Sequence, residues 1–242
     1  MAIMDPRVAA FREAFRREEI RPRYSGPWHA SFTFGVGAAV IVVAVAALND
    51  VRPLEWLTVP LTLLYANLSE YFGHRGPMHH PWRGLGIVYR RHAGQHHRFF
   101  TAEDMEIESP RDLKAVLFPG VMMAFFLLAF ALPVGLAIGW LLGANVACLF
   151  VASAMAYFLN YELLHLLYHL PQEGLIGRMS WLARLRQLHQ AHHDPSRMAR
   201  YNFNITYPLG DLLFGTLWRG QAGATQAAAW RGQSTSERRS DR

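Results

Sequence analysis

The chain has 242 residues, of which 52% are hydrophobic, and it carries a formal net charge of +6. Its apolar residues gather in runs that are too long for a soluble core. Residues 28–48 are nearly free of charge, residues 54–69 hold only Glu55, and residues 115–161 hold no charged residue. A helix that crosses the hydrocarbon layer needs about 20 apolar residues. The composition therefore argues against a soluble helical protein and predicts an all-α integral membrane protein.

The first 27 residues predict a basic, amphipathic N-terminal arm. Val8, Phe11 and Phe15 recur at helical spacing among several arginines. This pattern favours an interfacial helix that lies on the membrane over a helix that binds a partner.

Four transmembrane helices are expected within a membrane-embedded domain of residues 28–222. A break at Pro133 and Gly135 divides the last apolar run into two spans. The expected spans are 28–48, 54–73, 113–132 and 134–160. Residues 223–242 are rich in Ala, Gly, Gln, Ser and Arg, and we expect a disordered tail there.

Arginine placement predicts the orientation of these spans. Arginines crowd the N-terminal arm, the 74–111 loop and the segment after the fourth span, whereas the two opposite turns hold only Arg52. The positive-inside rule then puts both termini and the 74–111 loop in the cytoplasm. All the histidine clusters would lie on that side, as a cytoplasmic histidine-rich helical cap.

The positive charge does not point to nucleic acid, because the arginines lie where topology requires them and no aromatic-basic RNA motif accompanies them. Anionic lipid headgroups are the better counter-charge. Cys148 is the single cysteine, which excludes an internal disulfide and a multi-cysteine zinc site.

Histidine spacing carries most of the functional signal. Eleven of the twelve histidines fall in four clusters beside apolar runs. The clusters are His74 with His79 and His80, His92 with His96 and His97, His165 with His169, and His189 with His192 and His193. Neutral imidazole is the commonest protein ligand for transition metals. So many imidazoles exceed the need of one ion and predict a two-metal site.

The last two clusters fit regular helices. His165 and His169 are four residues apart at the end of the fourth span. His189, His192 and His193 stand at positions that share one helix face.

The first two clusters fit less simply. His92 and His96 are four residues apart, with His97 turned about 100° further round the helix. His74 and His79 are five apart, which is out of register for a straight helix, but a Gly-Pro pair bends the chain between them.

Ten histidines are the predicted metal ligands: His74, His79, His92, His96, His97, His165, His169, His189, His192 and His193. His80 is a possible extra ligand, and either it or His79 could be the true one. His29 stands alone and is interpreted as interfacial.

Iron is the favoured metal, because zinc prefers four ligands and closed sites. Three carboxylates could orient ligating imidazoles from behind, or could be plain helix-end charges. They are Glu70, Glu162 and Asp194.

The clusters resemble those of the membrane fatty acid hydroxylase/sterol desaturase superfamily in spacing, order and topology. The matching stretches are His74-x4-His79, His92-x3-His96-His97, His165-x3-His169 and His189-x2-His192-His193. Asn202-Phe203, Pro208, Asp211 and Phe214-Gly215-Thr216 resemble the family's stretch after the last cluster. The resemblance covers about residues 60–220. Asn204 departs from it, because several relatives have glycine there.

The resemblance implies a membrane di-iron oxygenase that uses O2 as co-substrate and takes electrons from a separate donor, such as cytochrome b5, a ferredoxin or a reductase. It implies hydroxylation of a lipid C–H bond, with a fatty acyl chain as the leading substrate. Sterol desaturation or methyl oxidation and carotenoid hydroxylation share the scaffold. A metal-dependent membrane hydrolase remains as a different class.

A metal transporter fits less well, since transporters bind near the bilayer midplane and these histidines lie at one face. The single lysine among 24 basic residues indicates a GC-rich genome and favours a bacterial inner membrane, with the active site on the cytoplasmic side.

Overall fold

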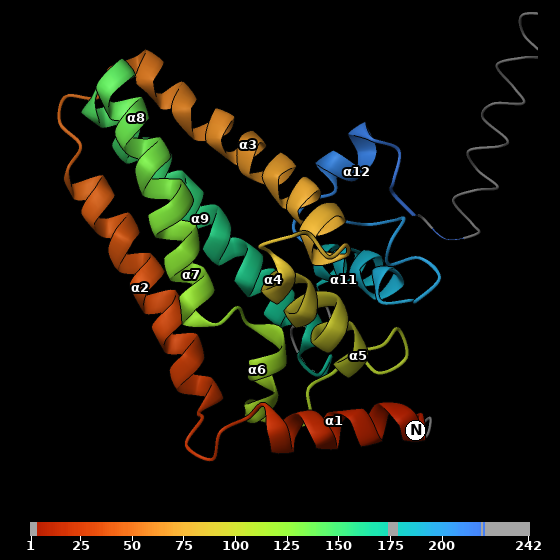
Figure 1. The fold of residues 1–242 in the computed structure, drawn as a ribbon. Helices are drawn as coiled ribbons and strands as arrows, with labels where there is room; N and C mark the ends of the chain where they lie inside the picture. The colour runs from red at the N-terminus through yellow and green to blue at the C-terminus, as the bar shows by residue number, and fades with distance from the viewer. Residues whose placement is uncertain (1–3, 174–178, 219, 221–242) are drawn as a thin grey trace, which may run out of the picture.

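The computed structural model describes residues 4–173, 179–218 and 220, and every regular element within them is helical (Figure 1). The all-α prediction is confirmed for this part of the chain. The predicted disordered tail, 223–242, lies outside the described residues.

Three helical stretches are long and apolar enough to cross a membrane: α2 (Gly26–Ala46), the run Pro110–Leu142, and α9 (Ala144–His169). The remaining predicted span corresponds to α3 (Thr58–Gly73), which has 16 residues. The short helix η1 (Pro53–Leu57) precedes α3 and η2 (His74–Met78) continues it. By itself α3 is shorter than the roughly 20 residues that a full span needs.

The predicted break at Pro133 is wrong. The chain runs helically from α7 (Gly120–Phe126) through η5 (Leu127–Ala131) into α8 (Leu132–Leu142). Pro133 lies in the first turn of α8, directly after the π-helical turn η5, where its missing N–H is tolerated. The chain reverses at Gly143 instead, with a φ of 104° that favours glycine. The third and fourth predicted spans therefore end and begin about ten residues too early.

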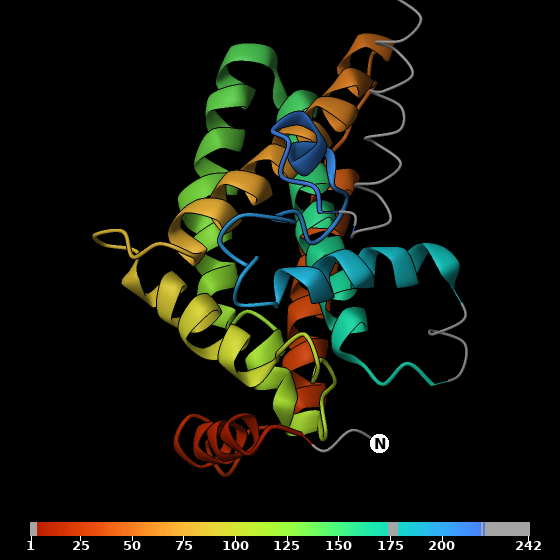
Figure 2. The ribbon, with the colours of Figure 1, turned by 90° about the vertical axis from the view of Figure 1, so that its right-hand side faces the viewer.

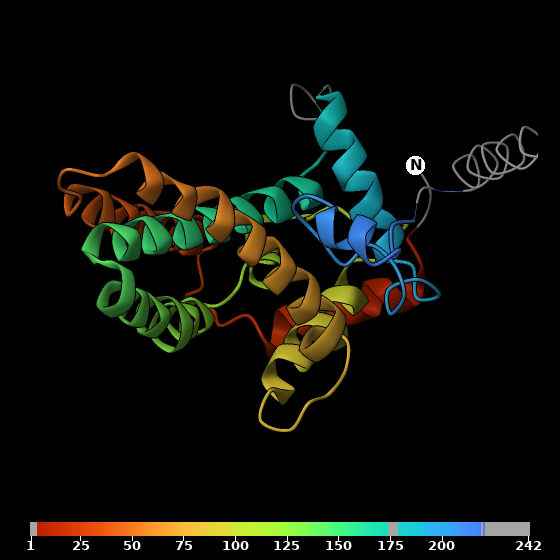
Figure 3. The ribbon, with the colours of Figure 1, turned by 90° about the horizontal axis from the view of Figure 1, so that it is seen from above.

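The central helix of the bundle is α9, which packs against α2, α3 and α8 (Figure 3). In an apolar stretch of 18 residues of α9, 56% of the residues are buried, against 17% in the corresponding stretch of α2. Because α9 is 26 residues long and begins just after the turn, its last residues emerge at the end of the bundle that carries the other histidines.

That histidine-bearing end is built from short helices (Figure 2). They are α4 (Gly86–Arg91), η3 (His92–His96), α5 (His97–Phe99), η4 (Pro110–Asp112), α6 (Leu113–Val116), α11 (Ser180–His192) and α12 (Leu209–Leu213).

Helix α1 (Pro6–Glu18) lies across the histidine-bearing end (Figure 1). Its apolar face packs into the protein: Phe15 is buried in a cluster with Phe99 and Phe100. Arg12 is 1% exposed, and its guanidinium donates to Glu108 and to backbone carbonyls of the 99–106 segment. Helix α1 is thus docked on the protein through its apolar face and Arg12, and its position at the membrane surface stays a prediction.

Arg12→Ala should lower the free energy of unfolding by about 3 kcal/mol, because it leaves several carbonyl groups without their donor. Thermal unfolding of the detergent-purified protein measures the loss. The matched control is Arg17→Ala on the same helix, whose 73%-exposed side chain pairs only with Glu18. That control should change stability by less than about 0.5 kcal/mol. Equal losses in the two variants would contradict a docking role for Arg12.

Candidate metal centre

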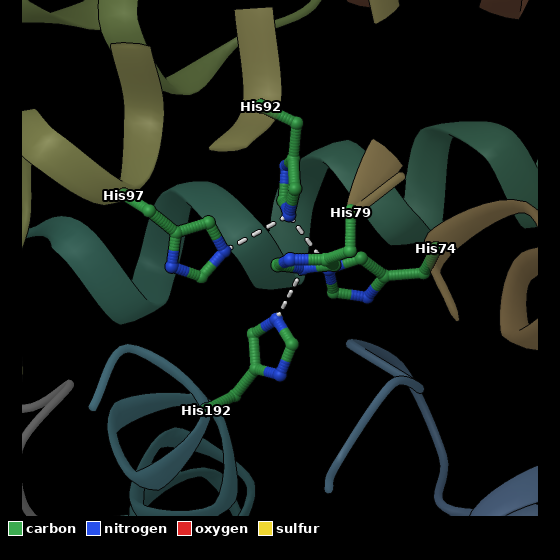
Figure 4. Close-up of side chains that lie close together, drawn as sticks. All are labelled: His74, His79, His92, His97 and His192. Carbon is green, nitrogen blue, oxygen red and sulfur yellow. Dashed lines mark hydrogen bonds between the residues drawn. The ribbon is translucent and has the colours of Figure 1, made fainter. Parts of the chain in front are cut away.

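Nine buried histidines form two groups in which the ring nitrogens lie within 4.8 Å of one another. The first group holds His74, His79, His92, His97 and His192, whose rings point toward one another (Figure 4). The second group holds His96, His165, His169 and His189.

His193, the tenth predicted ligand, lies between the groups. Its Nε2 is 3.1 Å from Nε2 of His189 and 3.2 Å from Nε2 of His96, while its ring stacks on His97 of the first group at 4.3 Å between centroids. The structure therefore brings all ten predicted ligands into one buried region.

Two π-helical turns decide which histidines meet. A π turn repeats after about five residues rather than four. In η2 it aligns His74 with His79, whose ring centroids are 5.0 Å apart. In η3 it aligns His92 with His97, whose Nε2 atoms are 3.0 Å apart.

The rings of His92 and His96 stack with their centroids 5.3 Å apart, as their spacing predicts, but the two residues belong to different groups. The π turn sends His96 into the second group, where its Nε2 lies 3.1 Å from that of His165. The histidines of the last cluster, which were expected on one helix face, are likewise shared between the two groups. On helix α11, His189 belongs to the second group and His192 to the first. The end of this helix lies beside both groups, so its histidine side chains can reach either one.

Backbone carbonyls hold the imidazoles from behind. Five histidines place Nδ1 against a carbonyl oxygen, which can only accept, so Nδ1 carries the proton and donates it. The pairs are His74 with Phe203, His96 with Ala115 (2.9 Å), His169 with Met105 (2.7 Å), His192 with Tyr201 (2.8 Å) and His193 with Phe100 (2.7 Å). In each of these rings Nε2 is left with a lone pair that points into the centre.

Facing lone pairs require a cation between them. The Nε2 atoms of His96 and His193 are 3.2 Å apart, and neither has a proton to share when both Nδ1 atoms donate to carbonyls. Burial lowers the pKa of His96 to about 4, and that of His192 likewise to about 4. The rings are therefore neutral near pH 7, and a proton does not supply the missing charge.

The donor set fits transition-metal ions. Nε2–Nε2 distances run from 2.7 Å for His74 and His92 to 3.2 Å for His96 and His193. Two nitrogens at right angles around an ion with metal–nitrogen bonds of about 2.1 Å would lie about 3.0 Å apart. All ten donors are imidazole nitrogens, a set that suits first-row transition metals rather than magnesium or calcium.

The three predicted orienting carboxylates make their hydrogen bonds elsewhere. Glu70 accepts from the backbone N–H groups of Ile205 and Thr206, and Glu162 accepts from the backbone N–H of Phe118. Asp194 caps a turn by accepting from Ser196 and pairs with Arg197. None of these bonds reaches an imidazole. Backbone carbonyls occupy Nδ1 of five rings, and Nδ1 of His97 and of His189 is buried without a hydrogen-bond partner among the described residues.

Two further histidines lie outside the groups. His80 is exposed, and its Nδ1 bonds with the Arg75 carbonyl. His29 is half-buried between the Tyr24 hydroxyl and the Phe118 carbonyl. The structure thus brings His79 into the centre and leaves His80 outside it.

The segment 201–206 holds two histidines through its backbone, a role that the sequence analysis did not assign to it. Its carbonyls at Tyr201 and Phe203 hold His192 and His74. Asn204, where several relatives have glycine, is buried and donates through its side chain to the Asn67 carbonyl. Backbone acceptors leave no signature in a sequence, so spacing alone could not reveal this segment.

An apolar cavity of about 390 Å³ leads to the first group of histidines. Helices α3, α7 and α9 supply most of its walls, with aromatic side chains such as Phe126, Phe150 and Phe158. His74 lines one end of it. The hydroxyl of Tyr161, another lining residue, is buried without a hydrogen-bond partner among the described residues.

The sequence of this chain matches one known protein family. Residues 59–216 match the sequence model of the fatty acid hydroxylase family, and this range includes all eleven clustered histidines. No curated protein and no solved structure matches the chain significantly. The match covers well over half of the 242 residues and spans the helices and segments that hold the histidines. The chain therefore belongs to the fatty acid hydroxylase superfamily.

Proposed function

We propose that this protein is a membrane di-iron oxygenase that hydroxylates a C–H bond of a lipid, with a fatty acyl chain as the leading substrate. One observation carries the proposal: ten imidazoles converge in a buried site that adjoins an apolar cavity. His74 belongs to both features, since it lies in the first group and lines the cavity.

The ligand assignment follows the two groups. His74, His79, His92, His97 and His192 would hold one iron ion, and His96, His165, His169 and His189 would hold the other, with His193 beside the second. Iron would supply the activation of O2, with electrons from a separate donor such as cytochrome b5, a ferredoxin or a reductase. In the five rings that have carbonyl partners, these partners keep Nδ1 protonated and Nε2 directed inward.

The cavity would bind the hydrocarbon chain and exclude water from it. Helices α3 and α7 both line the cavity, with residues such as Ala66 on α3 and Phe126 on α7. A chain entering between them from the bilayer would reach His74 without leaving an apolar environment. Entry through water would cost about 0.8 kcal/mol for each methylene exposed.

The proposal includes the side of the membrane on which the active site lies. Arginine placement favours a cytoplasmic active site in a bacterial inner membrane. Sterol desaturation, methyl oxidation and carotenoid hydroxylation would use the same histidines with a different cavity occupant.

Metal analysis tests the ligand assignment. Protein purified with iron supplied should hold about two iron ions per chain, and His79→Ala should lose at least one of them. His80→Ala is the matched control, because this neighbouring ring is exposed and bonds only with a backbone carbonyl. It should keep the iron content of the unmodified protein. A single zinc with no gain of iron would overturn the di-iron assignment, and loss of iron from His80→Ala would overturn the choice of ligand.

Narrowing the cavity should weaken lipid turnover without removing metal. Ala66 lines the cavity from α3, and Ala66→Trp would displace part of the hydrocarbon chain. Because the cavity would lose room for about two methylene groups, the affinity of the protein for its lipid substrate should fall roughly tenfold. Leu61→Trp is the control on the same helix, where the native side chain is 65% exposed and outside the cavity. Unchanged KM and kcat in Ala66→Trp, with normal iron content, would exclude this cavity as the substrate site.

Oxygen labelling distinguishes the reaction classes. With membranes and a reductant supplied, 18O2 should place 18O in a lipid hydroxyl group, detected by lipid mass spectrometry. Label arising only from 18O-water would indicate a metal-dependent hydrolase. A new double bond without label would indicate a desaturase.

A further inference from the structure

A second cavity, of about 610 Å³, has no histidine in its lining and differs from the first in character. Charged side chains dominate its lining: Arg21, Arg23, Arg91, Lys114, Glu18 and Glu19. Four cations against two carboxylates give this basic pocket a net charge of +2. The pocket therefore favours an anion.

The charge of Glu19 acts on the two inner cations, Arg91 and Lys114, without an ion pair to either of them. Glu18 pairs with Arg17, outside the pocket. Within the part of the chain that the structure describes, no carboxylate lies within 4.0 Å of Arg91 or Lys114. Both side chains are half-buried. A partly desolvated cation without a paired anion is unfavourable, and a bound anion would relieve that cost.

The pocket is also preorganised. The Arg91 guanidinium donates to Gln95 at 3.0 Å and to the Lys114 carbonyl at 2.7 Å. The Lys114 ammonium lies over the Tyr24 ring, 5.6 Å from its centroid. The Tyr24 hydroxyl is held by Nδ1 of His29 at 2.8 Å. Two cations of the pocket are thus fixed before any ligand arrives, which lowers the entropic cost of binding.

Position in the fold indicates where the anion comes from. Tyr24 and Pro119 line the pocket, and the apolar helices α2 and α7 begin directly after them, at Gly26 and Gly120. The pocket therefore lies at the level where apolar helices meet the aqueous side, which is the depth of lipid headgroups. Basic pockets at this depth bind the headgroups of anionic lipids.

Hollow shape and cation geometry favour a phosphate over an acidic protein. A protein partner would meet projecting surface charges, whereas here the cations line a concave space. Phosphate has enough oxygen acceptors for an arginine fork and an ammonium group at the same time.

We propose that the pocket formed by Arg21, Arg23, Arg91 and Lys114 binds the phosphate of an anionic membrane phospholipid. This site is separate from the histidine centre and does not depend on the proposed oxygenase activity.

Lipid retention by the full-length protein tests the proposal. The protein is reconstituted in vesicles of phosphatidylcholine with phosphatidylglycerol, extracted in detergent, and its bound lipid is measured by native mass spectrometry. The unmodified protein should retain one phosphatidylglycerol per chain. The double variant Arg23→Gln with Lys114→Gln should bind it about thirtyfold more weakly, because two charge contacts are lost.

The matched control removes the same charge elsewhere. Arg83 and Arg184 are exposed and lie outside the pocket, so Arg83→Gln with Arg184→Gln should retain the lipid fully. Equal retention by the two double variants, each with unchanged helix content, would overturn the proposal. An excess of inorganic phosphate distinguishes the source of the anion: the lipid should remain bound, and displacement by free phosphate would overturn the assignment to a membrane lipid.

Discussion

The structure depends on one electrostatic constraint, which is that imidazole lone pairs face each other in a buried space. Backbone carbonyls fix the proton on Nδ1 of His96 and His193, so their Nε2 atoms meet at 3.2 Å with no hydrogen to share. Burial keeps the rings of this region neutral. Such an arrangement is repulsive without a cation and strongly favourable with one. We infer that metal binding contributes directly to the stability of the histidine-bearing end.

Meeting this constraint requires unusual helix geometry. A regular α-helix would place residues five apart on different faces, yet His74 and His79, like His92 and His97, meet in one group. The π turns η2 and η3 accomplish this. Such turns cost backbone regularity and are found mostly at functional sites. Here η2 and η3 each lie on a histidine cluster, whereas the π turn η5 lies in an apolar run.

Sequence patterns predicted the components of the site but not their arrangement. Long apolar runs and clustered histidines were sufficient for a helical membrane protein with ten converging imidazoles, because hydropathy and spacing are local properties. The sorting of His96 away from His92 was not predictable, since a π turn has no clear sequence signature. The turn at Gly143 was misplaced to Pro133 because proline is tolerated in a first helical turn. The partners of Arg12 and the carbonyls behind the histidines depend on tertiary contacts, which spacing does not encode.

Glu70 connects the apolar cavity to the histidine centre, although it contacts no imidazole in its hydrogen bonds. It lines the cavity, and it accepts from the Tyr157 hydroxyl and from Thr206. These bonds anchor segment 201–206, whose Phe203 carbonyl holds His74. Glu70, which the sequence analysis considered as a possible partner of an imidazole, thus supports His74 indirectly, through the backbone of segment 201–206. One chain of hydrogen bonds, through Glu70 and the backbone of residues 203–206, therefore joins the cavity wall to His74.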